Sequence, residues 1–269
     1  MSDEHGHDEL LYEVRDHVGL ITFNRPERMN TITMGMLNAL SDRLLAADAD
    51  PEVRVIVITG AGRAWCAGLD VGAAASGQGI GGDVASLPPG ELDLRTAPPI
   101  VLHKIDTPTI AALNGGAAGY GLDLALGCDL RIASERAKLS AAYTARGLLP
   151  ESGGTWLLPR IVGWSTAAEL LFTARTLTAA EAMDLGLVSR VVPDGEILDA
   201  ALELAGQIAA NAPLAVRASK RMMRHAMTEG LEDHVQRQFL ALLPLFRTKD
   251  FAEGLTAFLE KRPPDFHGR

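Results

Sequence analysis

Two glycine-rich segments carry the clearest chemical signal in the sequence. Residues 60–70 (GAGRAWCAGLD) and residues 114–123 (NGGAAGYGLD) each directly follow a run of apolar residues. A glycine turn that leads from a buried strand towards a helix leaves backbone N–H groups free to bind a ligand. Two such turns after successive strands predict a pair of N–H donors that together stabilise an oxyanion.

The residues at the required positions do not match other known glycine-rich sites. A phosphate-binding P-loop ends in Gly-Lys-Ser/Thr, and neither segment contains that lysine. A dinucleotide-binding pattern that began at Gly60 would need glycine where the chain has Trp65. A third glycine turn, at residues 149–155, has Pro150 where a serine-hydrolase nucleophile elbow has its first glycine. Taken singly, each cluster could also be an ordinary tight turn of an α/β fold.

The elements that must position these turns alternate between strand and helix. Residues 14–25 predict a hairpin that turns at Asp16-His17, and Thr33 suits the N-cap of a helix that runs to about Ala49. Apolar runs predict buried strands at residues 53–59, 109–113, 130–133 and 188–192. Strands that alternate with helical patterns in this way indicate βαβ units and an α/β core.

The chain divides into three parts by composition. Residues 1–9 are polar and acidic and are predicted to form a disordered tail, and residues 10–197 form the α/β core. Within the core, residues 72–99 hold six glycines and four prolines without periodicity, which predicts a mobile loop with room for one short helix. Residues 198–269 are predicted to be helical throughout, with helices at about 198–210, 213–229, 231–246 and 250–260.

Charge and composition exclude several classes of partner. The 269 residues contain 25 Lys and Arg against 34 Asp and Glu, a formal net charge of −9. Such a chain lacks the positive field that attracts nucleic acid or an anionic membrane surface, so neither is predicted as a partner. No apolar run reaches the roughly 18 residues of a membrane span. The acidic N-terminus also differs from a signal peptide.

The cysteines and histidines indicate the redox state of the compartment and whether a metal site is expected. Cys66 and Cys128 are too few for a disulfide framework, which favours a reduced, cytoplasmic location. His5 and His7 lie in the predicted tail without a third or fourth ligand nearby, so no metal site is predicted.

Four segments, in order, carry a family resemblance. Residues 22–30 (TFNRPERMN), 64–70 (AWCAGLD), 114–129 (NGGAAGYGLDLALGCD) and 258–266 (FLEKRPPDF) resemble motifs of the enoyl-CoA hydratase/isomerase, or crotonase, superfamily. The resemblance implies an α/β fold built as a spiral of ββα repeats, followed by a helical region that forms trimers. It also implies an acyl-CoA substrate and a homotrimer or a hexamer made of two trimers.

The resemblance further implies catalytic roles. Family members stabilise a thioester enolate with two backbone N–H groups, which correspond here to Leu69 and Tyr120. Asp123 matches the first acid–base position, although an aspartate in a first helical turn also stabilises its own helix. The second glutamate of hydratases corresponds to Tyr143, whose phenol is a poor base near pH 7. Glu151 matches a position that is acidic in some double-bond isomerases, and an exposed loop glutamate is the alternative.

Coenzyme A binding is implied for a further group of residues. The positively charged side chains of this group would bind the phosphates of coenzyme A in an otherwise acidic protein. The main chain of the group would line the adenine and pantetheine. These residues are Arg25, Arg28, Ala64, Ala67, Gly68, Asp70 and Lys261. Lys261 lies in the C-terminal tail, which in the family often serves a neighbouring subunit. Coenzyme A is part of the substrate, so no separate cofactor is predicted.

The expected activity is hydration or double-bond isomerisation of an unsaturated acyl-CoA through a thioester enolate. Hydration needs a base for water and a proton source for the α-carbon, and Tyr143 replaces one of the two glutamates. Isomerisation needs one carboxylate that takes a proton and returns it, so the sequence favours isomerisation, or a specialised hydration, over fast hydration of a short 2-enoyl-CoA. A catalytically silent acyl-CoA binder, and a hydrolase or C–C lyase of the same superfamily, stay open as alternatives.

Overall fold

Two sheets organise the part of the chain that the computed structural model describes, which is residues 9–70, 72 and 94–269. The larger sheet has the strand order β1 (Leu10–Arg15), β2 (Val18–Phe23), β3 (Val55–Gly60), β5 (Thr109–Leu113), β7 (Leu130–Ser134) and β10 (Arg190–Val192). The smaller sheet has the order β4 (Ala64–Cys66), β6 (Gly116–Ala118), β8 (Lys138–Ser140) and β9 (Thr176–Thr178).

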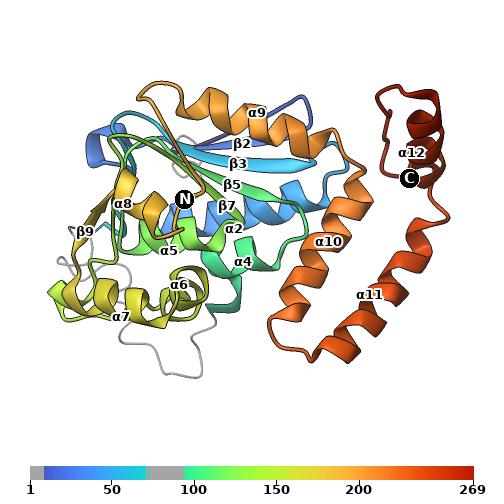
Figure 1. The fold of residues 1–269 in the computed structure, drawn as a ribbon. Helices are drawn as coiled ribbons and strands as arrows, with labels where there is room; N and C mark the ends of the chain where they lie inside the picture. The colour runs from blue at the N-terminus through green and yellow to red at the C-terminus, as the bar shows by residue number, and fades with distance from the viewer. Residues whose placement is uncertain (1–8, 71, 73–93) are drawn as a thin grey trace.

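The larger sheet is parallel except at its first pair. Strands β1 and β2 form the predicted hairpin, and both turn residues, Asp16 and His17, have positive φ (48° and 64°) as a tight two-residue hairpin requires. All six residues of β3 are buried because the sheet is covered on both faces. Figure 1 shows α9 (Ile197–Ala209) above the sheet and α2 (Met34–Ala49), α4 (Pro98–Lys104) and α5 (Tyr120–Gly127) below it.

A repeat of two strands and a helix underlies this layering. Strand β3 of the larger sheet leads into β4 of the smaller one, β5 leads into β6, and β7 leads into β8. Strand β6 is followed directly by α5, and β8 by the short helix η6 (Thr144–Arg146) and α6 (Gly154–Val162). The ββα repeat expected from the resemblance is therefore present. The first glycine turn joins β3 to β4 and continues past it, and the second passes through β6 into α5.

Most predicted elements are confirmed. Helix α2 spans Met34–Ala49, and the Thr33 side chain accepts a hydrogen bond from the Met36 N–H at 3.2 Å. Near the end of the loop predicted over residues 72–99, η5 (Leu94–Thr96) is the kind of short helix that the sequence left open, and α4 begins at Pro98, just before the predicted end. Proline suits these first helical positions, where an N–H has no partner. The rest of that loop and the predicted tail, apart from residues 9 and 72, lie outside the described residues.

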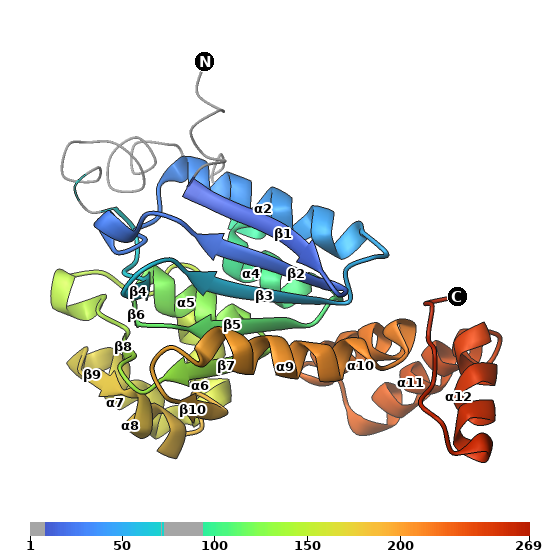
Figure 2. The ribbon, with the colours of Figure 1, turned by 90° about the horizontal axis from the view of Figure 1, so that it is seen from above.

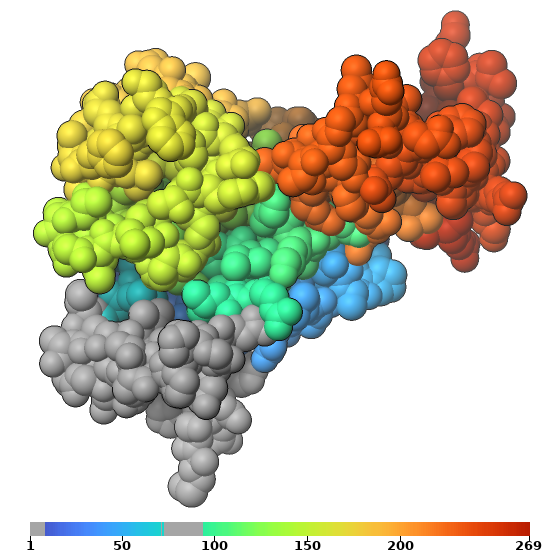
Figure 3. Space-filling model, turned by 90° about the horizontal axis from the view of Figure 1, so that it is seen from below, coloured from blue at the N-terminus to red at the C-terminus, as the bar shows by residue number. Residues whose placement is uncertain are grey.

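The C-terminal helices form two groups. The described helices here are α7 (Trp164–Thr173), α8 (Ala179–Asp184), α9, α10 (Pro213–Ala226), α11 (Leu231–Leu245) and α12 (Lys249–Glu260). Helix α9 packs on the larger sheet through Ala201, Ala205 and Ala209, so in packing terms the core continues past the expected boundary at residue 197. Figures 2 and 3 show α10, α11 and α12 standing out to one side of that core.

Ion pairs attach this helical arm to the core. Lys220 on α10 is 8% exposed and binds Asp129 at 2.7 Å. Arg217 binds Asp48 at 3.0 Å, and Arg224 binds Asp106 at 2.6 Å. Residues 217, 220 and 224 share one face of the helix, so a basic face meets aspartates of the core. No described helix is both long and apolar enough to cross a membrane.

Candidate active site

The two glycine turns lie side by side. Strands β4 and β6 pair in parallel with Ala64 opposite Gly116, which brings the chain after each strand to the same edge of the smaller sheet. A Cβ atom placed on Gly68 would lie 3.6 Å from the backbone nitrogen of Tyr120. The residues that follow Gly68 and Gly119 therefore present their backbone groups to the same small region.

The N–H of Leu69 points away from Ile32, the residue with which Leu69 is paired. Ile32 donates to the Gly68 carbonyl at 2.9 Å and accepts from the Asp70 N–H at 3.1 Å, which pairs Ile32 with Leu69 in a parallel bridge. In such a bridge the two residues that flank Leu69 make the bonds, so the N–H of Leu69 is directed to the opposite side. No described residue accepts a hydrogen bond from it.

The N–H of Tyr120 is the first of helix α5. Gly119, with φ 54°, precedes the helix, and its carbonyl accepts from the N–H groups of Leu122 and Asp123 at 2.8 and 3.1 Å. The first N–H groups of a helix have no partner within it, and they carry the positive end of its dipole. No described residue accepts from the Tyr120 N–H. Among the described residues, the N–H groups of Leu69 and Tyr120 are thus both without an acceptor, and that they bind an oxyanion stays a prediction.

Asp123 lies one turn further along α5 and is 1% exposed. The Tyr143 hydroxyl donates to its Oδ2 at 2.9 Å, and the backbone N–H groups of Ser152 and Gly154 also act on the carboxylate. Burial, together with the nearby Glu151, raises the pKa of Asp123 to about 7, against the lowering effect of those donors. Asp123 is therefore a carboxyl group that changes protonation near neutral pH.

Gly154 makes room for the Asp123 carboxylate. A methyl group at position 154 would overlap Oδ1 of Asp123 and would also approach Pro150 within 2.9 Å. Glycine at this first position of α6 allows the carboxylate to sit against the N-terminus of the helix, where backbone N–H groups favour negative charge. Helices α5 and α6 therefore meet at the point where the two acidic residues, Asp123 and Glu151, lie.

Glu151 differs from Asp123 in its partners. Its Oε1 atom is buried and has no hydrogen-bond partner among the described residues, and burial raises the pKa of the carboxyl group. Glu151 lies close enough to Asp123, Tyr120 and Tyr143 to raise the pKa of all three. The exposed loop glutamate considered from the sequence is therefore not what the structure shows, since the side chain faces inward beside Asp123.

Sequence reasoning missed the polar partners of these groups. Ser152 is buried, its side chain acts to lower the pKa of Tyr120, and its N–H acts on Asp123. Burial raises the pKa of both Tyr120 and Tyr143, so each phenol stays protonated, and that of Tyr143 donates to Asp123. No periodicity or motif in a single sequence identifies such pairings, because they depend on where the 150–154 turn meets α5.

The residues expected to bind coenzyme A are only partly brought together. Ala64 lies in β4, Ala67 and Gly68 follow it, and Arg28 is exposed on the short helix η1 (Pro26–Arg28). Arg25 binds Glu9 at 3.0 Å and Asp70 at 3.4 Å, so these two candidates hold each other. Lys261 ends α12, which Figure 2 shows at the far end of the molecule from α5.

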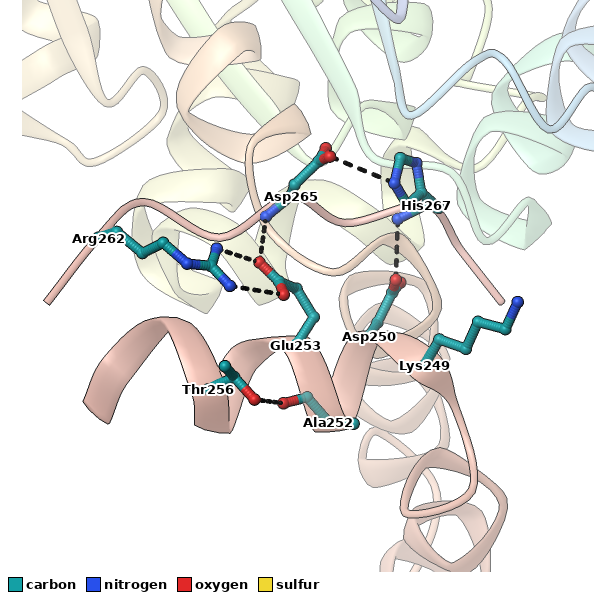
Figure 4. Close-up of a pocket in the computed structure, with 8 residues that line it drawn as sticks. All are labelled: Lys249, Asp250, Ala252, Glu253, Thr256, Arg262, Asp265 and His267. Atoms are coloured by element: carbon teal, nitrogen blue, oxygen red, sulfur yellow. Dashed lines mark hydrogen bonds and ion pairs between the residues drawn. The ribbon is translucent and has the colours of Figure 1, made fainter. Parts of the chain in front are cut away.

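A hollow of about 500 Å³ lies away from these residues, between α12 and the segment that follows it (Figure 4). Arg262 binds both carboxylate oxygens of Glu253 there, at 2.6 and 3.0 Å, and Asp250 accepts from the His267 N–H at 2.8 Å. The polar groups of this hollow bind one another, so it supplies no reactive group. Among the described residues no cluster of His, Cys, Asp and Glu could hold a metal ion.

Comparison with known proteins decides the family. Residues 13–269 match the family model for enoyl-CoA hydratase/isomerase. The chain belongs to the enoyl-CoA hydratase/isomerase family. A solved structure of this family, enoyl-CoA hydratase from Mycobacterium tuberculosis H37Rv, is 33% identical with a TM-score of 0.88, and the match covers 98% of this chain and 100% of that one. The expected superfamily, fold and enzyme class are confirmed.

Relatives within the enoyl-CoA hydratase/isomerase family differ in their reactions. Escherichia coli 2,3-dehydroadipyl-CoA hydratase is 36% identical, and the match covers 97% of this chain and 99% of that protein. Escherichia coli 1,2-epoxyphenylacetyl-CoA isomerase is 35% identical, with 97% and 98% covered. Because a hydratase and an isomerase are about equally similar, overall identity does not select the reaction, and the site must.

Proposed function

We propose that this enzyme moves a double bond along an unsaturated acyl-CoA, with Glu151 as the proton carrier. The observation that carries the proposal is the contrast between the two carboxyl groups. The Asp123 carboxylate is engaged by Tyr143 and by backbone N–H groups, whereas Oε1 of Glu151 is buried without a partner. A carboxylate oxygen without a partner is free to accept a substrate proton, and burial, which raises the pKa of Glu151, makes that carboxylate a better proton acceptor.

The proposed steps conserve atoms and charge. The thioester carbonyl oxygen binds the N–H groups of Leu69 and Tyr120, which stabilise the negative charge that develops on it. The Glu151 carboxylate takes a proton from the acyl chain, the electron pair moves into a dienolate, and the same proton returns at another carbon. No water is consumed, so the glutamate that Tyr143 replaces is not needed. The scheme uses no cofactor beyond the coenzyme A of the substrate.

Asp123 and Tyr143 have a supporting role in this proposal. Their hydrogen bond of 2.9 Å fixes both side chains beside Glu151, and the ionised form of Asp123 raises the pKa of the Tyr120 and Tyr143 phenols. Hydration is the second candidate function, because Asp123 and Glu151 are two carboxyl groups in one site and could together hold a water molecule.

Assembly and compartment complete the proposal. We propose a homotrimer, or two such trimers, in which the tail that contains Lys261 reaches coenzyme A bound to a neighbouring subunit. Cys66 and Cys128 are buried and unpaired, which accords with a reduced, cytoplasmic location.

The test compares 2-enoyl-, 3-enoyl- and 3,5-dienoyl-CoA substrates spectroscopically in wild type and variants. Glu151→Gln is expected to lower kcat on the true substrate by about a hundredfold or more, the usual worth of a general base. Glu135→Gln, on an exposed turn, serves as the matched control and is expected to keep wild-type activity. Rapid hydration of crotonyl-CoA, with no effect of Glu151→Gln, would refute both the isomerase proposal and the role of Glu151.

A further inference from the structure

Two buried asparagines hold the backbone of the first glycine turn. Asn30 is 0% exposed, and its Nδ2 donates to the carbonyls of Ala61 at 2.9 Å and Ala64 at 2.8 Å. Its Oδ1 accepts from the Arg25 N–H at 2.8 Å. A buried side-chain amide that makes three bonds to the main chain fixes the position of that main chain, since losing any of them would leave a buried polar group unpaired.

The second asparagine binds the backbone of the same turn. Asn114 is 6% exposed, and its Oδ1 accepts from the Gly60 N–H at 3.1 Å. Its Nδ2 donates to the carbonyls of Gly62 at 3.0 Å and Ala64 at 3.4 Å. The amides of Asn30 and Asn114 therefore converge on one atom, the carbonyl oxygen of Ala64, where strand β4 begins.

Each asparagine also lies in or next to a segment that contacts or leads to one of the two proposed oxyanion donors. Asn30 lies in residues 29–32, and Ile32 of that segment donates to Gly68 at 2.9 Å, next to Leu69. Asn114 precedes strand β6, which pairs with β4 and ends just before Gly119 and Tyr120. A shift of either amide relative to Ala64 would change the distance between the two N–H groups.

We infer that Asn30 and Asn114 are positioning residues that set the separation of the Leu69 and Tyr120 N–H groups. Both act through their bonds to the main chain and not through contact with the acyl chain. The inference rests on the proposed oxyanion pair. Misplacement of catalytic groups by about 1 Å can cost on the order of a hundredfold in rate, so a small change in this frame has a measurable effect on catalysis.

The test uses Asn114→Ala and Asn30→Gly. Glycine is chosen at position 30 because φ there is 55°, in the left-handed region that glycine adopts freely. The probe is an aryl-substituted acryloyl-CoA, whose absorption band moves to longer wavelength when its thioester carbonyl is polarised. Both variants are expected to lose most of this red shift and about tenfold to a hundredfold in kcat, with KM changed by less than about threefold.

Asn211→Ala is the matched control. The Asn211 amide donates to the Gln207 carbonyl at 2.8 Å on the exposed end of α9, so its removal is expected to leave the red shift and kcat unchanged. If Asn114→Ala does not fold, as judged by circular dichroism, Asn114→Ser replaces it, because a hydroxyl can still donate one of the two bonds.

The outcomes separate the inference from the proposed function. Absence of a red shift in the wild-type enzyme would refute the oxyanion pair itself. A wild-type red shift that folded Asn30→Gly and Asn114 variants retain in full, together with wild-type kcat, would overturn the positioning role and leave the oxyanion pair standing. Loss of the red shift in folded variants, with the Asn211→Ala protein unaffected, supports it.

Discussion

At the scale of single residues, the proposed oxyanion donors are main-chain groups, so side-chain and backbone changes at one position should act differently. Leu69→Ala keeps the N–H and is expected to keep most activity. Leu69→Pro removes the N–H and is expected to lower kcat by about a hundredfold or more. Steady-state rates of the two folded variants on the same acyl-CoA make the comparison. Equal losses in both would contradict a backbone oxyanion site.

The buried Asp123 carboxyl makes stability depend on pH. Its pKa is about 7 in the folded protein and about 3.9 in an unfolded chain, so the folded state binds the proton more tightly. The stability that this proton contributes is therefore complete below about pH 4 and is lost as the pH rises through about 7. Urea unfolding across this range should show the decline, of a few kcal/mol at most for this group.

Two variants test the origin of this dependence. Asp123→Asn removes the ionisation, so the free energy of unfolding should fall less steeply with pH, with a remaining slope from Glu151, whose pKa is also raised by burial. Tyr143→Phe removes a donor that favours the ionised Asp123, so the decline should extend to higher pH. An Asp123→Asn profile parallel to that of the wild type would contradict an elevated pKa at this position.

How far the site could be predicted depends on the kind of interaction. The pairing of the Leu69 and Tyr120 turns follows from local sequence, because glycine turns after parallel strands meet at one edge of a sheet. The different surroundings of Asp123 and Glu151 could not be predicted, because desolvation depends on residues distant in the chain. The same holds for Ser152, whose partners come from another helix.

At the scale of elements, the long patterns were predictable and the short ones were not. The hairpin, helix α2 and strand β5 follow from apolar periodicity and turn residues, and their bounds agree with prediction within a few residues. Strands β4, β6, β8 and β9 have three residues each, too few for an alternating pattern to show. Only the family resemblance pointed to a second strand in each repeat.

The contact between α5 and α6 gives an element-scale prediction. Gly154→Ala would place a methyl group against the Asp123 carboxylate, so either the 150–154 turn or α5 must move. We expect a loss of about tenfold or more in kcat, because Asp123 and Glu151 lie on the two sides of this contact. Activity and thermal unfolding are measured together on the purified variant.

Gly206→Ala is the control for this substitution. Position 206 is inside α9, and nothing lies within 4 Å of a Cβ placed there. Alanine should therefore keep activity and stabilise the helix by about 0.5–1 kcal/mol. Wild-type kcat in Gly154→Ala would show that Asp123 and the turn tolerate displacement, contrary to the tight fit described.

At the scale of the whole molecule, the helical arm leaves an apolar face uncovered. On α11, Leu231 is 78% exposed, Val235 52%, Phe239 55% and Leu242 40%, and the four recur near helical spacing. The core has no described element against these side chains, and Figure 1 shows α11 beyond α10, on the side away from the sheet. An exposed apolar stripe of this extent marks a protein–protein contact, and a second and third copy of the chain are the partners we propose.

The last prediction follows from this stripe. Light scattering at micromolar concentration should give a mass three or six times the 28.6 kDa of one chain, and a monomer would contradict the proposed assembly. Phe239→Glu places a charge in the stripe, and burial of an unpaired charge between subunits is costly, so the mass should fall towards that of one chain. Asn38→Asp adds the same charge at an exposed position of α2 and should keep the assembly. Because Phe239 is exposed in the single chain, the monomeric variant should stay folded, and its activity should fall if Lys261 of a neighbouring subunit binds coenzyme A.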